Sequence, residues 1–251
     1  MTTASEYLVT ALRGALPAES WTWLESACAE VARGASSERF CGLVSLASRY
    51  VPRRGAIAWK PATFLEGWNP ERWTILEAAR ARLVLARTDL ATPAGAAAVE
   101  EAFRYADVGE LCALYKTLAL LPDAKRFVWR AGEGCRSSMK AVFESVACDS
   151  PLPLRHFDDV AWRQMLIKAL FVEAPLARVF GLATRLDAET ARMALDLADE
   201  RRSAGRAVNP DTWRLVGKHA GARGIASLER ELASGTPEGK SAASEVLARS
   251  R

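Results

Sequence analysis

The chain has 251 residues, of which half are apolar and a quarter are charged, and this is the composition of an ordinary globular protein. Its net charge is only +4, and the arginines alternate with acidic residues, so the sequence lacks the clustered basic stripe of a dedicated nucleic-acid-binding protein. No stretch reaches the roughly 18–20 apolar residues of a membrane span.

The cysteines and the first residues indicate a cytoplasmic protein. Five widely spaced cysteines form no C-x-x-C pair or disulfide framework, which is typical of a reducing compartment. The first residues lack the basic and apolar regions of a signal peptide. We therefore expect a cytoplasmic location and reduced cysteines.

Helix signals recur along the chain, and strand signals are nearly absent. Residues 1–51 are predicted to contain a helical hairpin, because an apolar-periodic run from Pro17 stops at Gly34 and Ser36 can cap the next helix. Residues 52–70 are rich in proline and glycine and form the longest predicted irregular loop. Its aromatic residues either seal the core, which we favour, or mark a functional loop.

Residues 71–251 are predicted to form helical pairs. Asn69 and Pro70 are a cap and a first-turn proline for a helix over residues 71–87. Asp107 begins a capping-box pattern, Asp158 can cap a very apolar helix, and the prolines of residues 150–153 predict a break. The other helices are predicted over residues 91–106, 111–121, 123–148 with a bend near Gly132 and Gly134, and 160–172, and from Pro175, Asp187, Pro210 and Pro237.

The fold class that follows is all-α. Apolar residues on both sides of the turn Gly235-Thr236-Pro237 resemble a HEAT-type helix pair. We predict one domain over residues 1–251, an irregular HEAT-like superhelix of about a dozen helices connected by short turns. A compact multi-helix bundle is the second interpretation.

Two segments invite a chemical interpretation. The glycines and hydroxyls of residues 131–138 lack the lysine and the preceding strand of a phosphate-binding loop, so we interpret them as a helix bend. His156 precedes Asp158 and Asp159 and could act as a general base, or as a metal ligand with help from elsewhere. A helix cap beside a solvated loop is the simpler interpretation.

The helix over residues 160–172 carries two polar residues that need an explanation. Gln164 and Lys168 are four residues apart on a helix that is apolar nearly all round and is therefore expected to be buried. Lys168 must then reach the surface, pair with a carboxylate or face a cavity. Glu144 is the partner we expect, and we favour a structural ion pair over a ligand-lined cavity.

Five stretches of the sequence together carry a family signature, namely Gly67-Trp68-Asn69-Pro70-Glu71-Arg72-Trp73, Leu120-Leu121-Pro122-Asp123, Val142-Phe143-Glu144, Trp162-x-Gln164-Met165-x-x-Lys168-Ala169-Leu170-Phe171 and Trp213-Arg214-Leu215-Val216-Gly217. In their residues and their order these stretches resemble the EboA family, and the resemblance runs through most of the chain. The chain departs from the family at Arg136-Ser137-Ser138, where members tend to read Arg-Thr-Asn, and at Ser150-Pro151-Leu152-Pro153, where they tend to read Asn-Pro-Tyr-Pro.

The resemblance implies a part in secondary-metabolite biosynthesis, because the family is encoded beside a UbiA-like prenyltransferase, a sugar-phosphate cyclase and metal-dependent TIM-barrel proteins. We expect a helical binding or accessory protein for a small-molecule intermediate or a partner enzyme. The alternative is an enzyme acting on a prenylated or cyclitol-derived intermediate, and a HEAT-like DNA-binding protein ranks third.

The site residues expected from these hypotheses lie between Arg136 and Lys168. Glu144 and Lys168 are the catalytic residues if the protein is an enzyme, and the candidate ligand contacts are Arg136, Gln164, His156 and Trp162, with His156 or Asp158 at the mouth of the pocket. We expect no metal or cofactor and no nucleic acid, and peripheral contact with a membrane is left open.

Overall fold

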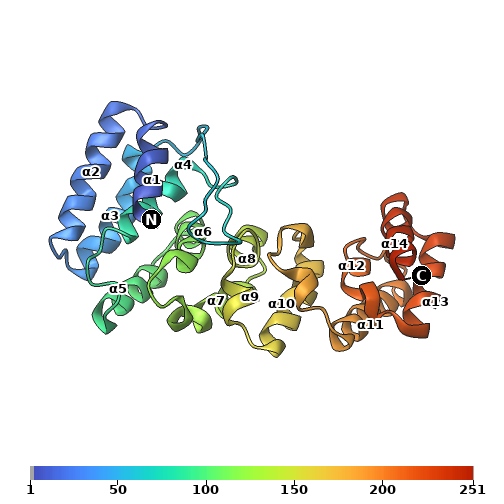
Figure 1. Cartoon of the computed structure of the whole chain (residues 1–251). Coiled ribbons are helices and arrows are strands. Elements are labelled where there is room, and N and C mark those ends of the chain that lie inside the picture. Colours follow the sequence, from blue (N-terminus) through green and yellow to red (C-terminus); the bar gives the residue numbers. More distant parts are fainter. Residues whose placement is uncertain (1–2, 251) are drawn as a thin grey trace. The chain divides into compact units, whose positions relative to one another are not determined.

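The computed structural model describes the backbone of residues 3–250 and the side chains of residues 3–248. Within that part of the chain it contains 14 α-helices, five short 3-10 helices and no strand (Figure 1). The predicted all-α class is confirmed. The HEAT-like arrangement of the helices stays a prediction.

The chain divides into two compact units. Unit 1 comprises Met1–Gly134 and Asp149–His156, and unit 2 comprises Cys135–Cys148 and Phe157–Arg251. The prediction of one domain over residues 1–251 stays a prediction. Within the described residues, no helix is both long and apolar enough to cross a membrane. No disulfide joins any of the five cysteines, all of which are described.

Unit 1 is built mostly from amphipathic helices whose apolar faces meet in a common core. They are α1 (Ala4–Arg13), α2 (Ala18–Ala32), α3 (Ser37–Tyr50), α4 (Ile75–Val84), α5 (Pro93–Arg104), α6 (Val108–Thr117), η1 (Leu118–Leu120), η2 (Ala124–Phe127), α7 (Val128–Arg136), which continues into unit 2, and α9 (Leu152–His156). The predicted hairpin corresponds to α2 and α3, and Ser36 caps α3 as predicted because its side chain accepts a hydrogen bond from the Arg39 N–H.

Two glutamates each complete a helix cap and also form an ion pair between helices α4 and α6. Glu77 completes the capping box of α4 and pairs with Lys116 of α6 at 2.6 Å. Glu110 completes the capping box that begins at Asp107 and pairs with Arg80 of α4 at 3.3 Å. Each helix start is therefore also a tertiary contact, and α6 begins directly after Asp107, three residues earlier than predicted.

The irregular loop between α3 and α4 runs from Val51 to Thr74, so the predicted helix start at Glu71 is wrong. Asn69 accepts a hydrogen bond from the Glu71 N–H in a local turn, whereas Thr74 and Glu77 form the capping box that begins α4 at Ile75. The helix also ends at Val84 instead of Arg87.

Aromatic side chains pack this loop onto α1. The ring of Tyr7 is stacked on Trp59 with centroids 5.9 Å apart and meets Phe64 and Trp68 edge-on. The Tyr7 hydroxyl also donates a hydrogen bond to the Lys60 carbonyl. These contacts fit the interpretation that the aromatics of the loop seal the core.

Unit 2 contains the remaining helices. They are α8 (Lys140–Ala147), α10 (Asp159–Val172), η3 (Leu176–Arg178), η4 (Leu182–Thr184), α11 (Ala188–Ser203), α12 (Thr212–Val216), η5 (Gly217–His219), α13 (Gly221–Ser234) and α14 (Pro237–Ser250). The predicted caps are confirmed, because the side chains of Asp158 and Asp187 accept hydrogen bonds from N–H groups in the first turns of α10 and α11.

Two predicted interruptions lie elsewhere than expected. The break in residues 123–148 falls at Ser137–Met139, after Gly132 and Gly134, because the Ser137 hydroxyl accepts a hydrogen bond from the Met139 N–H and competes with the helix. The chain breaks after Ala147 as expected, but Pro153 then lies in the first turn of α9, where proline costs no helical hydrogen bond.

The pair α13 and α14 is fixed to the rest of unit 2 through Arg202 of α11. Its guanidinium donates to the Ser227 hydroxyl at 2.7 Å and to Glu231 at 2.9 Å, and it lies over the Trp213 ring. Glu231 is only 3% exposed, so this contact is a largely buried ion pair. It holds the C-terminal helices beside α11 and α12.

Candidate functional site

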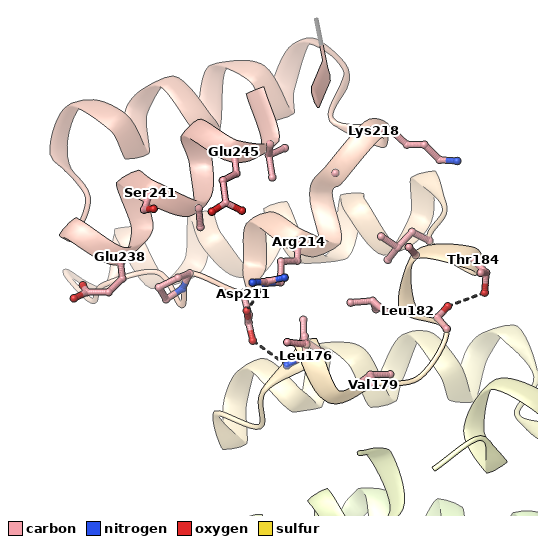
Figure 2. Close-up of a pocket in the computed structure, with 18 of the residues that line it drawn as sticks. Leu176, Val179, Leu182, Thr184, Asp211, Arg214, Lys218, Glu238, Ser241 and Glu245 are labelled. Carbon is pink, nitrogen blue, oxygen red and sulfur yellow. Dashed lines mark hydrogen bonds and ion pairs between the residues drawn. The ribbon is translucent and has the colours of Figure 1, made fainter. Parts of the chain in front are cut away.

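Unit 2 contains a cavity of about 1110 Å³, slightly larger than the usual range for small-molecule sites. Three segments line it, namely the stretch from Leu176 to Leu186, the turns around α12 from Pro210 to Lys218, and one face of α14 from Pro237 to Val246 (Figure 2). The segments are far apart in sequence and are brought together by the packing of α11 to α14.

The floor of the cavity is apolar. Leu176 and Val179 anchor it in the core because both are buried. Leu182, Leu186 and Pro210 complete the floor and are less deeply buried, and Ala242 and Val246 add apolar surface on the facing helix α14. Ala177, Ala183 and Thr184 on the rim are exposed, so the cavity is open to solvent.

Asp211 holds two of the three walls together. One carboxylate oxygen accepts a hydrogen bond from the Leu176 N–H at 2.9 Å, and the other pairs with the Nε of Arg214, also at 2.9 Å. The Asn209 side chain accepts from the Asp211 N–H at 3.0 Å and donates to the Leu170 carbonyl. Asp211 therefore ties η3 to α12 and orients Arg214 towards the cavity.

The rim carries charged side chains from α12, η5 and α14. Figure 2 shows the Glu245 carboxylate pointing across the cavity towards Arg214, while Lys218 extends away from the other labelled side chains. Among the described residues, neither Glu238 nor Glu245 has an ion pair or a hydrogen bond through its carboxylate. The lining of the cavity thus combines an apolar floor with the unpaired carboxylates of Glu238 and Glu245.

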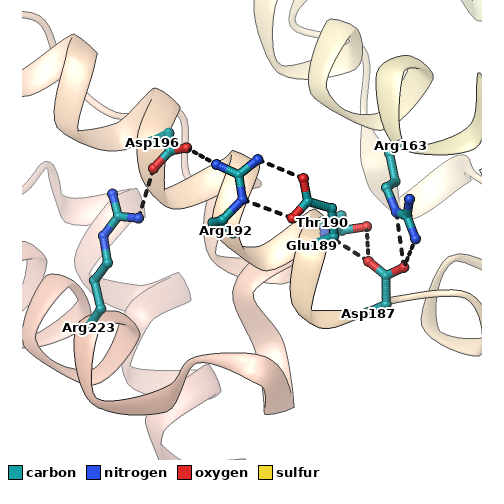
Figure 3. A network of polar contacts seen from close by, with 7 residues as sticks. All are labelled: Arg163, Asp187, Glu189, Thr190, Arg192, Asp196 and Arg223. Carbon is teal, nitrogen blue, oxygen red and sulfur yellow. Dashed lines mark hydrogen bonds and ion pairs between the residues drawn. The ribbon is translucent and has the colours of Figure 1, made fainter. Parts of the chain in front are cut away.

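A polar network fixes the start of α11 next to the cavity wall (Figure 3). Arg163 of α10 donates to Asp187 at 3.0 and 2.6 Å, and Asp187 caps α11 through Thr190. The Arg163 guanidinium is the main cause that holds the pKa of Asp187 well below its usual range, and the hydrogen bonds from Thr190 add to it. Arg192 extends the network through Glu189 and Asp196. Asp187 directly follows the cavity residue Leu186, so the network braces that wall.

The ion pair predicted between Lys168 and Glu144 is wrong. Glu144 pairs with Arg178 of η3 at 2.6 Å and lies 3.9 Å from Lys140, one turn earlier on α8. Lys168 has no ion pair with any described residue, and its side chain is half-buried on α10. It reaches the surface along its apolar stem, which was one of the three alternatives for this lysine.

The composition of α10 predicted a helix that is buried on all sides, and this prediction is wrong. Gln164 is exposed, and Val160 and Phe171 on the same face are 59% and 55% exposed. Trp162 lies on the opposite face and is a core residue, 1% exposed, with the Arg185 guanidinium 5.0 Å above its ring. The helix therefore buries one face and presents the other to solvent.

The other two predicted ligand contacts lie at helix ends. Arg136 is exposed at the end of α7, and His156 ends α9 in unit 1. Burial, followed by the nearby Arg155 and Lys125, lowers the pKa of His156. None of the six predicted site residues lines the cavity, although all six are described. No cluster of three potential metal ligands occurs in the described part of the chain.

The sequence of this chain matches a family model described as "Metabolite traffic protein EboA" over residues 4–217. The chain belongs to the EboA family. Neither a curated protein nor a solved structure matches it. In this EboA-family protein the matched stretch contains the floor of the cavity and the pair of Asp211 and Arg214, whereas α14 lies outside it.

Sequence reasoning missed the cavity, although part of the signal was present. In the sequence Pro210 indicates only a helix start, whereas in the structure Asn209 accepts a hydrogen bond from the Asp211 N–H and Asp211 links two walls. The acidic residues Glu238 and Glu245 are seven apart on α14, which is two turns and therefore one face of the helix. That spacing was visible in the sequence, but the segments that face it were not.

Proposed function

We propose that this EboA-family protein binds a small amphipathic metabolite in the cavity of unit 2 and transfers it to another protein of its pathway without catalysing a reaction itself. The observation that carries the proposal is the open cavity of about 1110 Å³ with an apolar floor, in a chain whose family is described as metabolite traffic proteins. A cavity of that size accommodates a ligand of several hundred daltons.

The lining supports binding and release. Its apolar floor stabilises a ligand by removing apolar surface from water, at about 25 cal/mol per Å². Exposed residues on the rim, such as Ala177 and Ala183, leave a path for exchange that requires no unfolding. Asp211 is already engaged with Leu176 and Arg214, so its carboxylate serves the scaffold.

The proposal includes the HEAT-like interpretation of the helical pairs, a cytoplasmic location and a partner enzyme that loads or unloads the ligand. The short turn between α13 and α14 and their packing against α11 and α12 support the HEAT-type pair at the C-terminal end. Glu144, Lys168, Gln164, Trp162, Arg136 and His156 remain predicted site residues for the enzyme hypothesis, which has no support from the cavity.

The test is native mass spectrometry of the protein purified from its own host, followed by denaturing extraction of any bound compound. We expect a stoichiometric small molecule on the wild type. Ala242→Trp, which fills the cavity, should remove it, whereas Ser244→Trp on the exposed face of the same helix should retain it. Thermal unfolding checks that both variants fold. A compound retained by folded Ala242→Trp would refute the cavity as the binding site.

A further inference from the structure

The cavity is made of two parts that differ in their relation to the family. Its floor and the Asp211–Arg214 pair lie within the family match, which ends at residue 217. The facing wall comes from α14, which lies beyond the match and contributes Pro237, Glu238, Ser241, Ala242, Glu245 and Val246. The floor thus lies within the stretch that matches the family model, and the wall formed by α14 lies beyond it.

The charges of the two parts also differ. In the floor part, Arg214 is already paired through its Nε with Asp211. In the wall part, Glu238 and Glu245 have no ion pair among the described residues, and Glu245 points into the cavity (Figure 2). Lys218 also lines the cavity, but its side chain extends away from the other labelled side chains in Figure 2. The two carboxylates outnumber this one ammonium, so the unbalanced charge of the lining is negative.

We propose that α14 is the ligand-selecting wall of the cavity and that Glu245 binds a protonated amine on an amphipathic ligand whose apolar part lies on the floor. The inference rests on the proposed function, since it names the ligand class of that site. A cation placed beside Glu245 gains Coulomb attraction to this carboxylate, and because the side chain is exposed the gain is that of a partly exposed ion pair. An anion at the same place meets the unpaired carboxylate and is repelled, because Asp211 already neutralises Arg214.

Three probes of equal chain length separate the ligand classes, namely octylammonium, octan-1-ol and octanoate, each titrated by calorimetry near neutral pH. The wild type should bind octylammonium about two- to five-fold more tightly than octan-1-ol, the range of a partly exposed ion pair, and octanoate most weakly. The preference should weaken as salt is added.

Variants then assign the preference to one residue. Glu245→Gln should bind octylammonium and octan-1-ol equally, and Glu245→Lys should prefer octanoate. Glu229→Gln, which removes the same charge from exposed α13 away from the cavity, should behave as the wild type. The inference would be overturned if the wild type bound octan-1-ol or octanoate as tightly as octylammonium. It would also be overturned if Glu245→Gln kept the preference for octylammonium.

The cavity-filling variant keeps this inference distinct from the proposed function. If all three probes bind the wild type equally and Ala242→Trp blocks them, the cavity is a ligand site and only the ligand class is wrong. If Ala242→Trp folds and leaves the binding of every probe unchanged, both this inference and the assignment of the cavity as the metabolite site fail.

Discussion

Asp211 is the residue whose removal should loosen the cavity most, because it joins two of its walls. In Asp211→Ala the N–H of Leu176, a fully buried residue, loses a charged acceptor, and such hydrogen bonds contribute about 1.5–3 kcal/mol. The partner Arg214 is half-exposed, so losing this ion pair adds at most about 1 kcal/mol. We therefore expect local opening at η3 to become easier by about 2–4 kcal/mol.

Hydrogen exchange of the Leu176 amide measures this opening directly. A change of about 2–4 kcal/mol corresponds to a loss of protection of roughly thirty- to a thousand-fold. Asp211→Asn is the matched variant, because its amide oxygen keeps one neutral acceptor, and it should lose about half as much free energy. Unchanged protection of Leu176 in Asp211→Ala would refute the argument that this carboxylate holds η3 against α12.

Three further predictions concern the frame of the two units. Glu110→Gln should lower the free energy of unfolding by about 3 kcal/mol in urea titrations, because Arg80 stays buried without a charged partner. Because the pKa of Asp187 is lower in the folded protein than its unfolded value of about 4, this carboxylate stabilises the fold above that pH, and the stabilisation is lost as the pH falls below it. In Asp187→Asn the free energy of unfolding, measured at several pH values, should therefore fall less steeply with acid. Burial raises the pKa of the Cys135 thiol to about 12, so iodoacetamide should modify half-buried Cys41 first, as followed by mass spectrometry.

Helix starts were the part of this fold that local sequence predicts well. Ser36, Asp107, Asp158 and Asp187 all cap the helices expected of them, because a capping bond joins residues only two or three positions apart. The same rule explains the error at Asn69, where two legitimate capping signals occur within five residues. Thr74 prevails there because Glu77 completes its capping box and also reaches Lys116, a contact that depends on the tertiary fold.

The candidate site was the part that sequence could not give. Helical spacing predicted that Lys168 either pairs with a carboxylate, reaches the surface or faces a cavity. It could not decide among these alternatives, because the outcome depends on which face of α10 is covered by other helices. Arg178, which takes Glu144, lies in a 3-10 turn without periodicity, so nothing in the pattern marked it as a competitor. A cavity lined by three distant segments follows from packing alone.

Lys168→Met separates the two functional hypotheses most cleanly. Lys168 has no ion pair with any described residue and is half-buried, so its replacement strands no charge and should change the free energy of unfolding by less than about 0.5 kcal/mol. Glu144→Gln, by contrast, removes the charge of a carboxylate that pairs with Arg178 and should cost about 1 kcal/mol.

Both variants lie off the cavity, so a binding protein should keep its compound in native mass spectrometry after either change. An enzyme that uses Lys168 would instead lose product formation in Lys168→Met while remaining folded. Loss of the bound compound from folded Lys168→Met would move the site from the cavity to the exposed face of α10, where Gln164 and Phe171 flank this lysine.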